Sequence, residues 1–129
     1  MILLLDTSTP VCRLTFVDGD QLHSYEWESG RELARHLHAY LRDRLAEQSL
    51  AFTDLAGIGV MKGPGSFTGL RIGLTVLNTL ADTLDIPIVG VEMGDDWQGE
   101  ALRRLQGGEN DQLVLPFYGR EAHITQPRK

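Results

Sequence analysis

The stretch Gly63-Pro-Gly-Ser-Phe-Thr-Gly-Leu-Arg-Ile-Gly73 decides the fold, and an apolar, β-type run that ends at Met61 comes before it. The two glycines that flank its proline favour a tight turn, because glycine adopts backbone angles that are closed to other residues. Ser66 or Thr68 can then cap a helix by accepting a hydrogen bond from an unpaired backbone N–H. The stretch therefore predicts a strand, a tight turn and a long helix that extends to Leu84.

The predicted helix over 67–84 has more apolar surface than one contact requires. When its residues are placed at intervals of about 100°, one apolar stripe suits packing on a sheet. That stripe contains Leu70, Leu74, Leu77, Ala81 and Leu84. A second stripe beside it contains Gly69, Ile72, Gly73, Val76 and Leu80. The glycine pair leaves room for another helix to approach closely, so this second stripe is either buried inside the domain or covered by another protein.

The rest of the chain predicts an α/β domain with a mixed sheet. Apolar or alternating runs predict strands at Ile2–Leu5, Val11–Val17, Gln21–Trp27, Leu55–Met61 and Ile86–Val91. Asp18-Gly19-Asp20 predicts a hairpin between the second and third strands. An amphipathic helix is expected over Arg31–Gln48, and a weaker helix over Asp95–Gln106. This order favours parallel strands joined by helices beside an antiparallel hairpin, and Leu113–Phe117 is a last apolar run.

Size, charge and cysteine content limit the classes of function. A chain of 129 residues is expected to form one domain, and its formal charge of −6 argues against independent nucleic-acid binding. The only cysteine in the sequence, Cys12, lies in a strand-like run and is expected to be a buried structural thiol. The apolar runs are too short to span a bilayer, and Met1–Leu5 lacks the basic leader of a signal peptide. These features predict a cytoplasmic protein.

One weak candidate for an anion or nucleotide site is present. A glycine-rich turn before a helix can bind an anion through backbone N–H groups, and the first strand ends in a carboxylate and hydroxyls. The candidate residues are Asp6, Thr7, Gly65 and Ser66. A structural turn is the favoured interpretation, because the spacings of a P-loop and of the dinucleotide fingerprint are absent. His36 and His38 diverge on a helix and cannot share a metal, so neither a metal site nor a catalytic residue is assigned.

The stretch Gly63–Gly73 also resembles the TsaB (YeaZ) family of bacterial tRNA-modification proteins. Leu3–Thr9, Arg31–Leu33 and Ile86–Val91 resemble further family segments in the expected order. The resemblance implies a ribonuclease-H-like lobe of the actin, Hsp70 and sugar-kinase superfamily, here over residues 1–117. Family members carry a second lobe of comparable size, and the resemblance therefore predicts a short form that lacks most of it. Residues 118–129 are expected to form an extended or disordered tail.

The resemblance implies a non-catalytic subunit that needs no cofactor of its own. In the family its partner is TsaD, a paralogue of the same fold that transfers a threonylcarbamoyl group to the adenosine beside the tRNA anticodon. A TsaE-like ATPase joins the complex, tRNA is contacted only indirectly, and the same helices can form a homodimer when the protein is alone. The residues that the resemblance places at the partner contact are Leu33, Leu37, Tyr40, Leu41, Gly69, Ile72, Gly73, Val76 and Leu80.

One other function is compatible with part of the sequence. An ATP-binding phosphotransferase or ATPase of the actin-like superfamily would use Asp6, Thr7 and the glycine turn. A single lobe lacks the facing wall with which such enzymes exclude water and hold the nucleotide. The substitution Gly73→Leu is expected to abolish partner binding and to leave a folded monomer. An unfolded variant would instead mean that the glycines serve the internal core.

Overall fold

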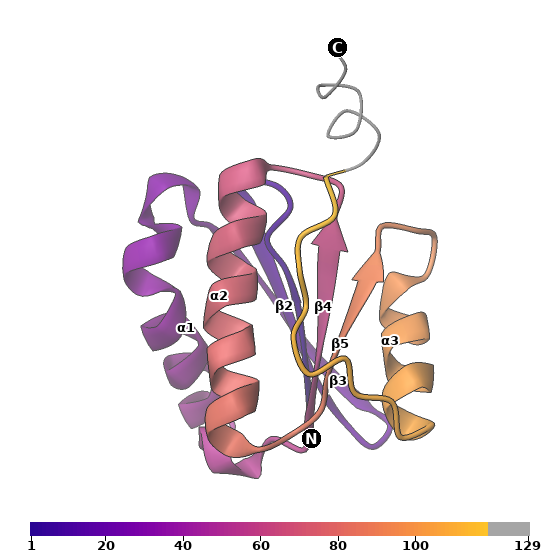
Figure 1. Cartoon of the computed structure of the whole chain (residues 1–129). Helices are drawn as coiled ribbons and strands as arrows, with labels where there is room; N and C mark the ends of the chain where they lie inside the picture. Colours follow the sequence, from indigo (N-terminus) through magenta and orange to yellow (C-terminus); the bar gives the residue numbers. More distant parts are fainter. Residues whose placement is uncertain (119–129) are drawn as a thin grey trace, which may run out of the picture.

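Residues 1–118, which the computed structural model describes, form a five-stranded sheet with helices on both faces (Figure 1). The strands are β1 (Ile2–Asp6), β2 (Val11–Asp18), β3 (Gln21–Glu28), β4 (Gly57–Gly63) and β5 (Ile88–Glu92). Their order across the sheet is β3-β2-β1-β4-β5. β1 pairs antiparallel with β2 and parallel with β4, and β4 pairs parallel with β5. This arrangement confirms the predicted ribonuclease-H-like lobe with a mixed five-stranded sheet.

Two helices cover one face of the sheet, and a third helix covers the other face (Figure 1). α1 (Leu33–Glu47) and α2 (Phe67–Leu84) lie side by side, whereas α3 (Trp97–Gln106) packs on β4 and β5 from the opposite side. The stripe of α2 that was predicted to pack on the sheet is buried, with Leu70 and Leu77 each 0% exposed. The main core therefore lies between the sheet and the layer formed by α1 and α2.

The structure shifts two predicted boundaries where short 3-10 turns form. The first helix begins at Leu33 because Gly30–Glu32 forms such a turn. The fourth strand covers Gly57–Gly63 instead of 55–61, since a second turn over Phe52–Asp54 precedes it. The predicted β2–β3 hairpin is present, and Gly19 occupies its turn with a φ of 62°.

Two later elements also begin after their predicted positions. β5 begins at Ile88, because Pro87 has no N–H to donate to a neighbouring strand. α3 begins at Trp97, where the carboxylate of Asp96 caps the helix by accepting a hydrogen bond from the N–H of Gly99 at 3.1 Å. Both changes are small, and the order of elements is the predicted one.

The segment after α3 forms an extended strap, Asn110–Tyr118, that crosses beside α2 (Figure 1). Its Val114 side chain is buried and lies against Gly90 of β5. Asn78 of α2 holds the strap by two hydrogen bonds: its amide nitrogen donates to the Val114 carbonyl at 2.8 Å, and its amide oxygen accepts from the Val114 N–H at 2.9 Å. The strap therefore belongs to the core that lies over β5.

Both ends of the strap are anchored to the lobe. Near its start, the N–H of Asp111 donates to the carbonyl of Ile88 at 2.8 Å, and near its end the N–H of Phe117 donates to the carbonyl of Lys62 at 2.7 Å. The apolar run Leu113–Phe117 thus packs beside α2 and outside the sheet. Of the predicted tail over 118–129, all but residue 118 lies outside the described residues.

Cys12 is buried in β2, in agreement with the structural role predicted for it. Burial, with a smaller contribution from the nearby Asp6 carboxylate, raises the pKa of its thiol to about 12. The thiol therefore stays protonated at neutral pH, and a protonated thiol is a poor nucleophile. Among residues 1–118, none of the helices combines the length and the apolar character that crossing a bilayer requires.

Candidate functional site

The glycine turn and the start of α2 pack against the loop that follows β1. Gly65, Gly69 and Gly73 face this loop, and a Cβ atom at any of the three would overlap atoms of Thr7 or Ser8. The glycines therefore let α2 approach the chain's own loop, and they are not free to receive a helix of another protein. This corrects the assignment of Gly69 and Gly73 to the partner contact.

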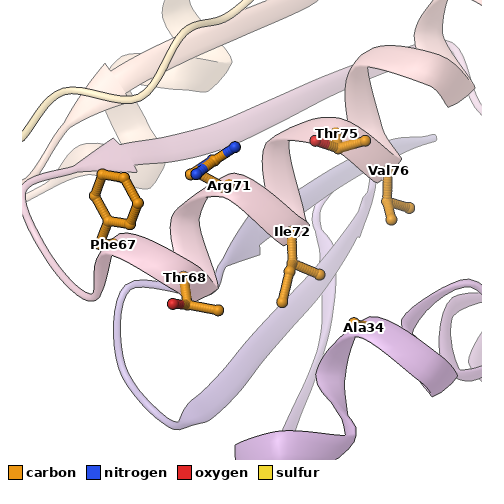
Figure 2. Close-up of a pocket in the computed structure, with 7 residues that line it drawn as sticks. All are labelled: Ala34, Phe67, Thr68, Arg71, Ile72, Thr75 and Val76. Atoms are coloured by element: carbon orange, nitrogen blue, oxygen red, sulfur yellow. The ribbon is translucent and has the colours of Figure 1, made fainter.

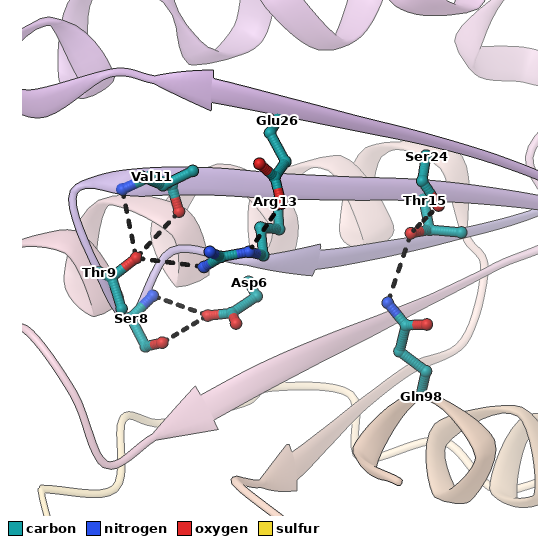
Figure 3. A network of polar contacts seen from close by, with 9 residues as sticks. All are labelled: Asp6, Ser8, Thr9, Val11, Arg13, Thr15, Ser24, Glu26 and Gln98. Carbon is teal, nitrogen blue, oxygen red and sulfur yellow. Dashed lines mark hydrogen bonds and ion pairs between the residues drawn. The ribbon is translucent and has the colours of Figure 1, made fainter. Parts of the chain in front are cut away.

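The candidate anion-site residues form the hydrogen bonds of this contact. The Asp6 carboxylate accepts from the N–H and the hydroxyl of Ser8 at 2.8 and 2.6 Å (Figure 3). The Thr7 hydroxyl donates to the Gly69 carbonyl at 2.7 Å, and the Ser66 N–H donates to the Ser8 carbonyl at 2.7 Å. The Ser66 hydroxyl caps α2 by accepting from the Gly69 N–H at 3.3 Å. These bonds engage the groups that would have to face a phosphate, which favours the structural interpretation of the turn.

The predicted contact residues of α1 lie mostly in the interior. Leu33, Leu37 and Leu41 are 3%, 0% and 0% exposed and belong to the core beneath the helix. An amphipathic helix has one apolar face, and here the chain's own core covers that face. Tyr40 is partly exposed, but its ring stacks on Trp27 of β3 with 4.7 Å between the ring centres. The three leucines are therefore corrected from partner contacts to core residues.

An open groove remains between α1 and α2. Its first cavity, of about 400 Å³, is lined by Ala34, Phe67, Thr68, Arg71, Ile72, Thr75 and Val76 (Figure 2). A second cavity, of about 290 Å³, is lined by His38, Thr75, Val76, Thr79, Leu80 and Thr83. Because the two cavities share Thr75 and Val76, they form one continuous feature, which we call the α1–α2 groove. The structure thus brings together three of the predicted contact residues, Ile72, Val76 and Leu80.

The α2 side of the groove is uncharged over almost three helical turns. Between Arg71 and Asp82, the exposed residues of α2 are Thr75 and Thr79. Threonine is a poorer helix former than the charged residues that usually occupy the exposed face of a helix. Depletion of charged residues is a property of the buried centre of protein–protein interfaces. The composition of this face is therefore typical of a surface that another protein covers.

The sequence interpretation missed several residues that line the groove. Phe67 lies at one end of the groove and is 54% exposed. The Arg71 guanidinium lies 5.2 Å from the centre of the Phe67 ring. The ring of Tyr118 from the strap stacks on Phe67 with 4.7 Å between the ring centres. A helical projection places Phe67 within about 20° of Leu74 in the buried stripe, so the period of α2 predicts burial and not a place in the groove. Ala34 and His38 give no signal in the sequence either, since only the packing of two helices makes them neighbours of α2.

The titratable residues of the lobe do not gather into a metal centre. Within residues 1–118, no group of three or more His, Cys, Asp or Glu side chains is placed to hold a metal ion. His36 lies 3.2 Å from the Glu32 carboxylate on the exposed side of the helix. His38 instead packs its ring 5.0 Å from that of Phe52. The α1–α2 groove, which holds three of the predicted contact residues, is therefore the candidate site.

Comparisons with known proteins give one consistent family for the chain. The family model described as TsaD, tRNA N6-adenosine threonylcarbamoyltransferase, matches residues 28–97. The tRNA threonylcarbamoyladenosine biosynthesis protein TsaB of Escherichia coli (strain K12) is 30% identical over 90 residues, and TsaB of Haemophilus influenzae is 30% identical over 126 residues. The chain belongs to the family that this model describes, and both of these curated relatives are named TsaB. The predicted family resemblance is thereby confirmed.

A solved structure agrees with the fold of this TsaB-family lobe. YeaZ from Pseudomonas aeruginosa is 31% identical with a TM-score of 0.68, and the match covers 81% of this chain and 49% of that chain. The match to the Escherichia coli TsaB covers 70% of this chain and 39% of the relative, and the match to the Haemophilus influenzae TsaB covers 97% and 52%. The chain thus spans about half the length of the TsaB relatives that it matches, or less.

Proposed function

We propose that this chain is a non-catalytic subunit in the synthesis of threonylcarbamoyladenosine in tRNA, and that it binds a TsaD-like paralogue through the α1–α2 groove. The observation that carries the proposal is the uncharged, exposed face of α2 between Arg71 and Asp82. Exposed threonines and half-buried Ile72 and Val76 are suited to contact with another helix layer, because they offer small apolar groups without charges to desolvate.

The family relationship suggests what shape of partner the groove accepts. Because the family model for TsaD matches this lobe, a TsaD-like partner has a comparable layer of two helices on its sheet. Two such layers can pack face to face as a bundle of four helices, with ridges of one pair in the groove of the other. The strap runs beside α2 on the side of Asn78, and its Tyr118 ring contacts the groove at Phe67.

The hydrogen bonds at the end of β1 favour a non-catalytic subunit over an ATP-dependent enzyme. Asp6 is the carboxylate that an ATP-dependent phosphotransferase would use, and it binds Ser8 within its own loop. The alternative enzyme predicts micromolar binding of ATP with Mg²⁺ and turnover of the nucleotide. Calorimetric titration of the purified chain with ATP and Mg²⁺ tests this directly. Heat of binding together with release of phosphate would favour the enzyme over the subunit that we propose.

A bulky side chain in the groove tests the partner contact. Ala34 is exposed and lines the groove, so Ala34→Trp fills the groove without disturbing the core. We expect this variant to bind the TsaD paralogue of the same genome at least about a hundredfold more weakly, a loss of about 2.7 kcal/mol. The measurement is isothermal titration calorimetry, with circular dichroism to establish that the variant is folded.

His36→Trp is the matched control for this experiment. His36 is also exposed on α1, but it lies about 160° around the helix from Ala34, on the flank away from the groove. The control should bind the paralogue as the unmodified chain does. Equal affinities of the two variants and the unmodified chain would refute the assignment of the groove to the partner, and weak binding by both variants would point to a contact on the outer face of α1.

A further inference from the structure

The outer edge of the sheet at β5 is lined by side chains that take the place of a further strand. In a parallel pair of strands, alternate residues direct their backbone groups toward the neighbouring strand. The N–H of Ile58 in β4 donates to the Pro87 carbonyl at 2.9 Å, so Pro87 faces β4. By this alternation, the backbone groups of Ile88 and Gly90 point away from β4, toward the outer edge of the sheet.

Four hydrogen bonds satisfy these outward backbone groups. The Ile88 N–H donates to Oδ1 of Asn110 at 3.1 Å, and the Ile88 carbonyl accepts from the Asp111 N–H at 2.8 Å. The Gly90 N–H donates to Oδ2 of Asp111 at 2.8 Å, and the Gly90 carbonyl accepts from Nη1 of Arg104 at 2.9 Å. Both outward donors and both outward acceptors thus have a partner, as they would beside a sixth strand. We call Asn110, Asp111 and Arg104 the edge clasp.

The members of the edge clasp are also held by one another and by their neighbours. Arg104 donates from Nη2 to Oδ1 of Asp111 at 2.5 Å and from Nε to Oε1 of Glu109 at 2.7 Å. Oδ1 of Asn110 accepts a second bond, from the Gln112 N–H at 2.9 Å. The side chains of Arg104 and Asp111 are 23% and 31% exposed, so water competes with their bonds less than at an open surface pair. The clasp is therefore a fixed arrangement and not a chance contact of free side chains.

The two edges of the sheet differ in the residues that they expose to another chain. The edge strand β3 contains Glu26 and Glu28, and charges on an edge strand discourage pairing with a strand of another molecule. The edge strand β5 reads Ile-Val-Gly-Val over 88–91 and carries its first charge at Glu92. A short apolar edge of this kind invites pairing when its backbone groups are free. The clasp therefore covers the edge whose own sequence offers less protection.

We propose that the edge clasp closes the sheet of this lobe to strand addition, because it takes the hydrogen bonds that β5 would otherwise offer to an extended segment of another chain. The segment that it excludes is β5 of a second copy, since two identical strands can pair antiparallel about a twofold axis. The inference is independent of the proposed function, because the α1–α2 groove is lined by other residues than those of the clasp.

Hydrogen exchange of the unmodified chain gives the first test and requires no variant. The N–H groups of Ile88 and Gly90 should exchange about as slowly as the N–H of Val89, which faces β4. At an open edge they would exchange at least about a hundredfold faster than Val89. Comparable protection of the three residues supports the clasp. Fast exchange at Ile88 or Gly90 would overturn it.

Variants that open the clasp give the second test. Asp111→Ala removes the acceptor of the Gly90 N–H and a partner of Arg104. We expect exchange at Gly90 to become at least about tenfold faster. We also expect assemblies larger than those of the unmodified chain at the same concentration, measured by analytical ultracentrifugation. Arg104→Met opens the same residue from its carbonyl side and keeps the apolar stem, so it gives the same test if Asp111→Ala does not fold.

Asn78→Ala is the matched control, because it loosens the same strap at Val114 and leaves the clasp residues in place. The variants are compared at temperatures at which their free energies of unfolding are equal. Larger assemblies of the clasp variants alone would support the proposal. Equal association of Asn78→Ala and the clasp variants would mean that lost stability is the cause, and the proposal would be overturned. It would also be overturned if Gly90 exchanged fast in a clasp variant whose assemblies matched those of the unmodified chain.

Discussion

The two flanks of α2 differ in what lies beside them. The chain's own strap packs against one flank, whereas the other flank faces an open groove. On one flank, Asn78 pairs with both backbone groups of Val114, and the strap closes over the sheet. On the other flank, Ile72, Val76 and the neighbouring threonines line an open groove. The first flank carries a polar side chain that pairs with a backbone segment of the same chain, and the second carries side chains with small apolar groups. The comparison teaches that two flanks of one helix can differ in residue type when different neighbours lie beside them.

The largest effect is expected on the side of α2 that faces the β1 loop. Gly73→Leu would overlap Thr7, which is buried and bound to the Gly69 carbonyl, so the loop and the helix would have to separate. We expect a loss of at least about 3 kcal/mol in the free energy of unfolding. Urea denaturation followed by circular dichroism measures it.

Thr75→Leu provides the matched test on the open flank. Thr75 is exposed, and the same leucine there should change the free energy of unfolding by less than about 1 kcal/mol. If Gly73→Leu proves as stable as the unmodified chain, the close packing of the β1 loop on α2 would be contradicted, and the glycine would again be available to a partner.

An intermediate effect is expected at the strap. Asn78→Ala removes both hydrogen bonds to Val114 and leaves its N–H and carbonyl without their partner. We expect a loss of about 2 kcal/mol in the free energy of unfolding, together with faster hydrogen exchange at Val114. Binding of the TsaD paralogue should change little, because this flank lies apart from the groove. A strong loss of affinity in a folded Asn78→Ala variant would show that the two flanks are not independent.

The smallest effect on the free energy of unfolding is expected on the open flank, and there we expect a gain in stability instead of a loss. Thr79 is exposed, and alanine is the better helix former, so Thr79→Ala should raise the free energy of unfolding by about 0.5 kcal/mol. Affinity for the TsaD paralogue should fall modestly, since the complex loses the threonine methyl group. Urea denaturation and calorimetry measure the two quantities. Destabilisation would instead mean that the hydroxyl bond from Thr79 to the Thr75 carbonyl at 2.8 Å outweighs helix propensity.

Most of the fold could be predicted from the sequence, because turns, caps and helical periods depend on residues that are close in sequence. The Asp-Gly turn, the Ser66 cap and the period of Leu70, Leu74 and Leu77 each require only a few neighbouring residues. The order of strands and helices then restricts the sheet to few topologies. The strap was not predicted, because its anchors are Asn78 and the edge of β5, which lie far from it in sequence.

The candidate site was predicted less well, and the reason differs between the two helices. For α1, the apolar positions Leu33, Leu37 and Leu41 were assigned outward, yet a helix with one apolar stripe uses that stripe for its own core first. For α2, the space left by Gly69 and Gly73 is visible in the sequence, but its occupant is Thr7, which is distant along the chain. A periodicity identifies a surface to be covered, and only the tertiary structure identifies what covers it.

The latch between Thr7 and the start of α2 has a consequence for the kinetics of assembly. Because the Thr7 hydroxyl binds the Gly69 carbonyl, the first turn of α2 is tied to the end of β1 before any encounter. The groove wall that begins there consequently needs little ordering when a second protein arrives, and less conformational entropy is lost on association. The variant Thr7→Val removes this hydrogen bond. It should therefore slow the association of the chain with its partner, even where the final contacts are unchanged.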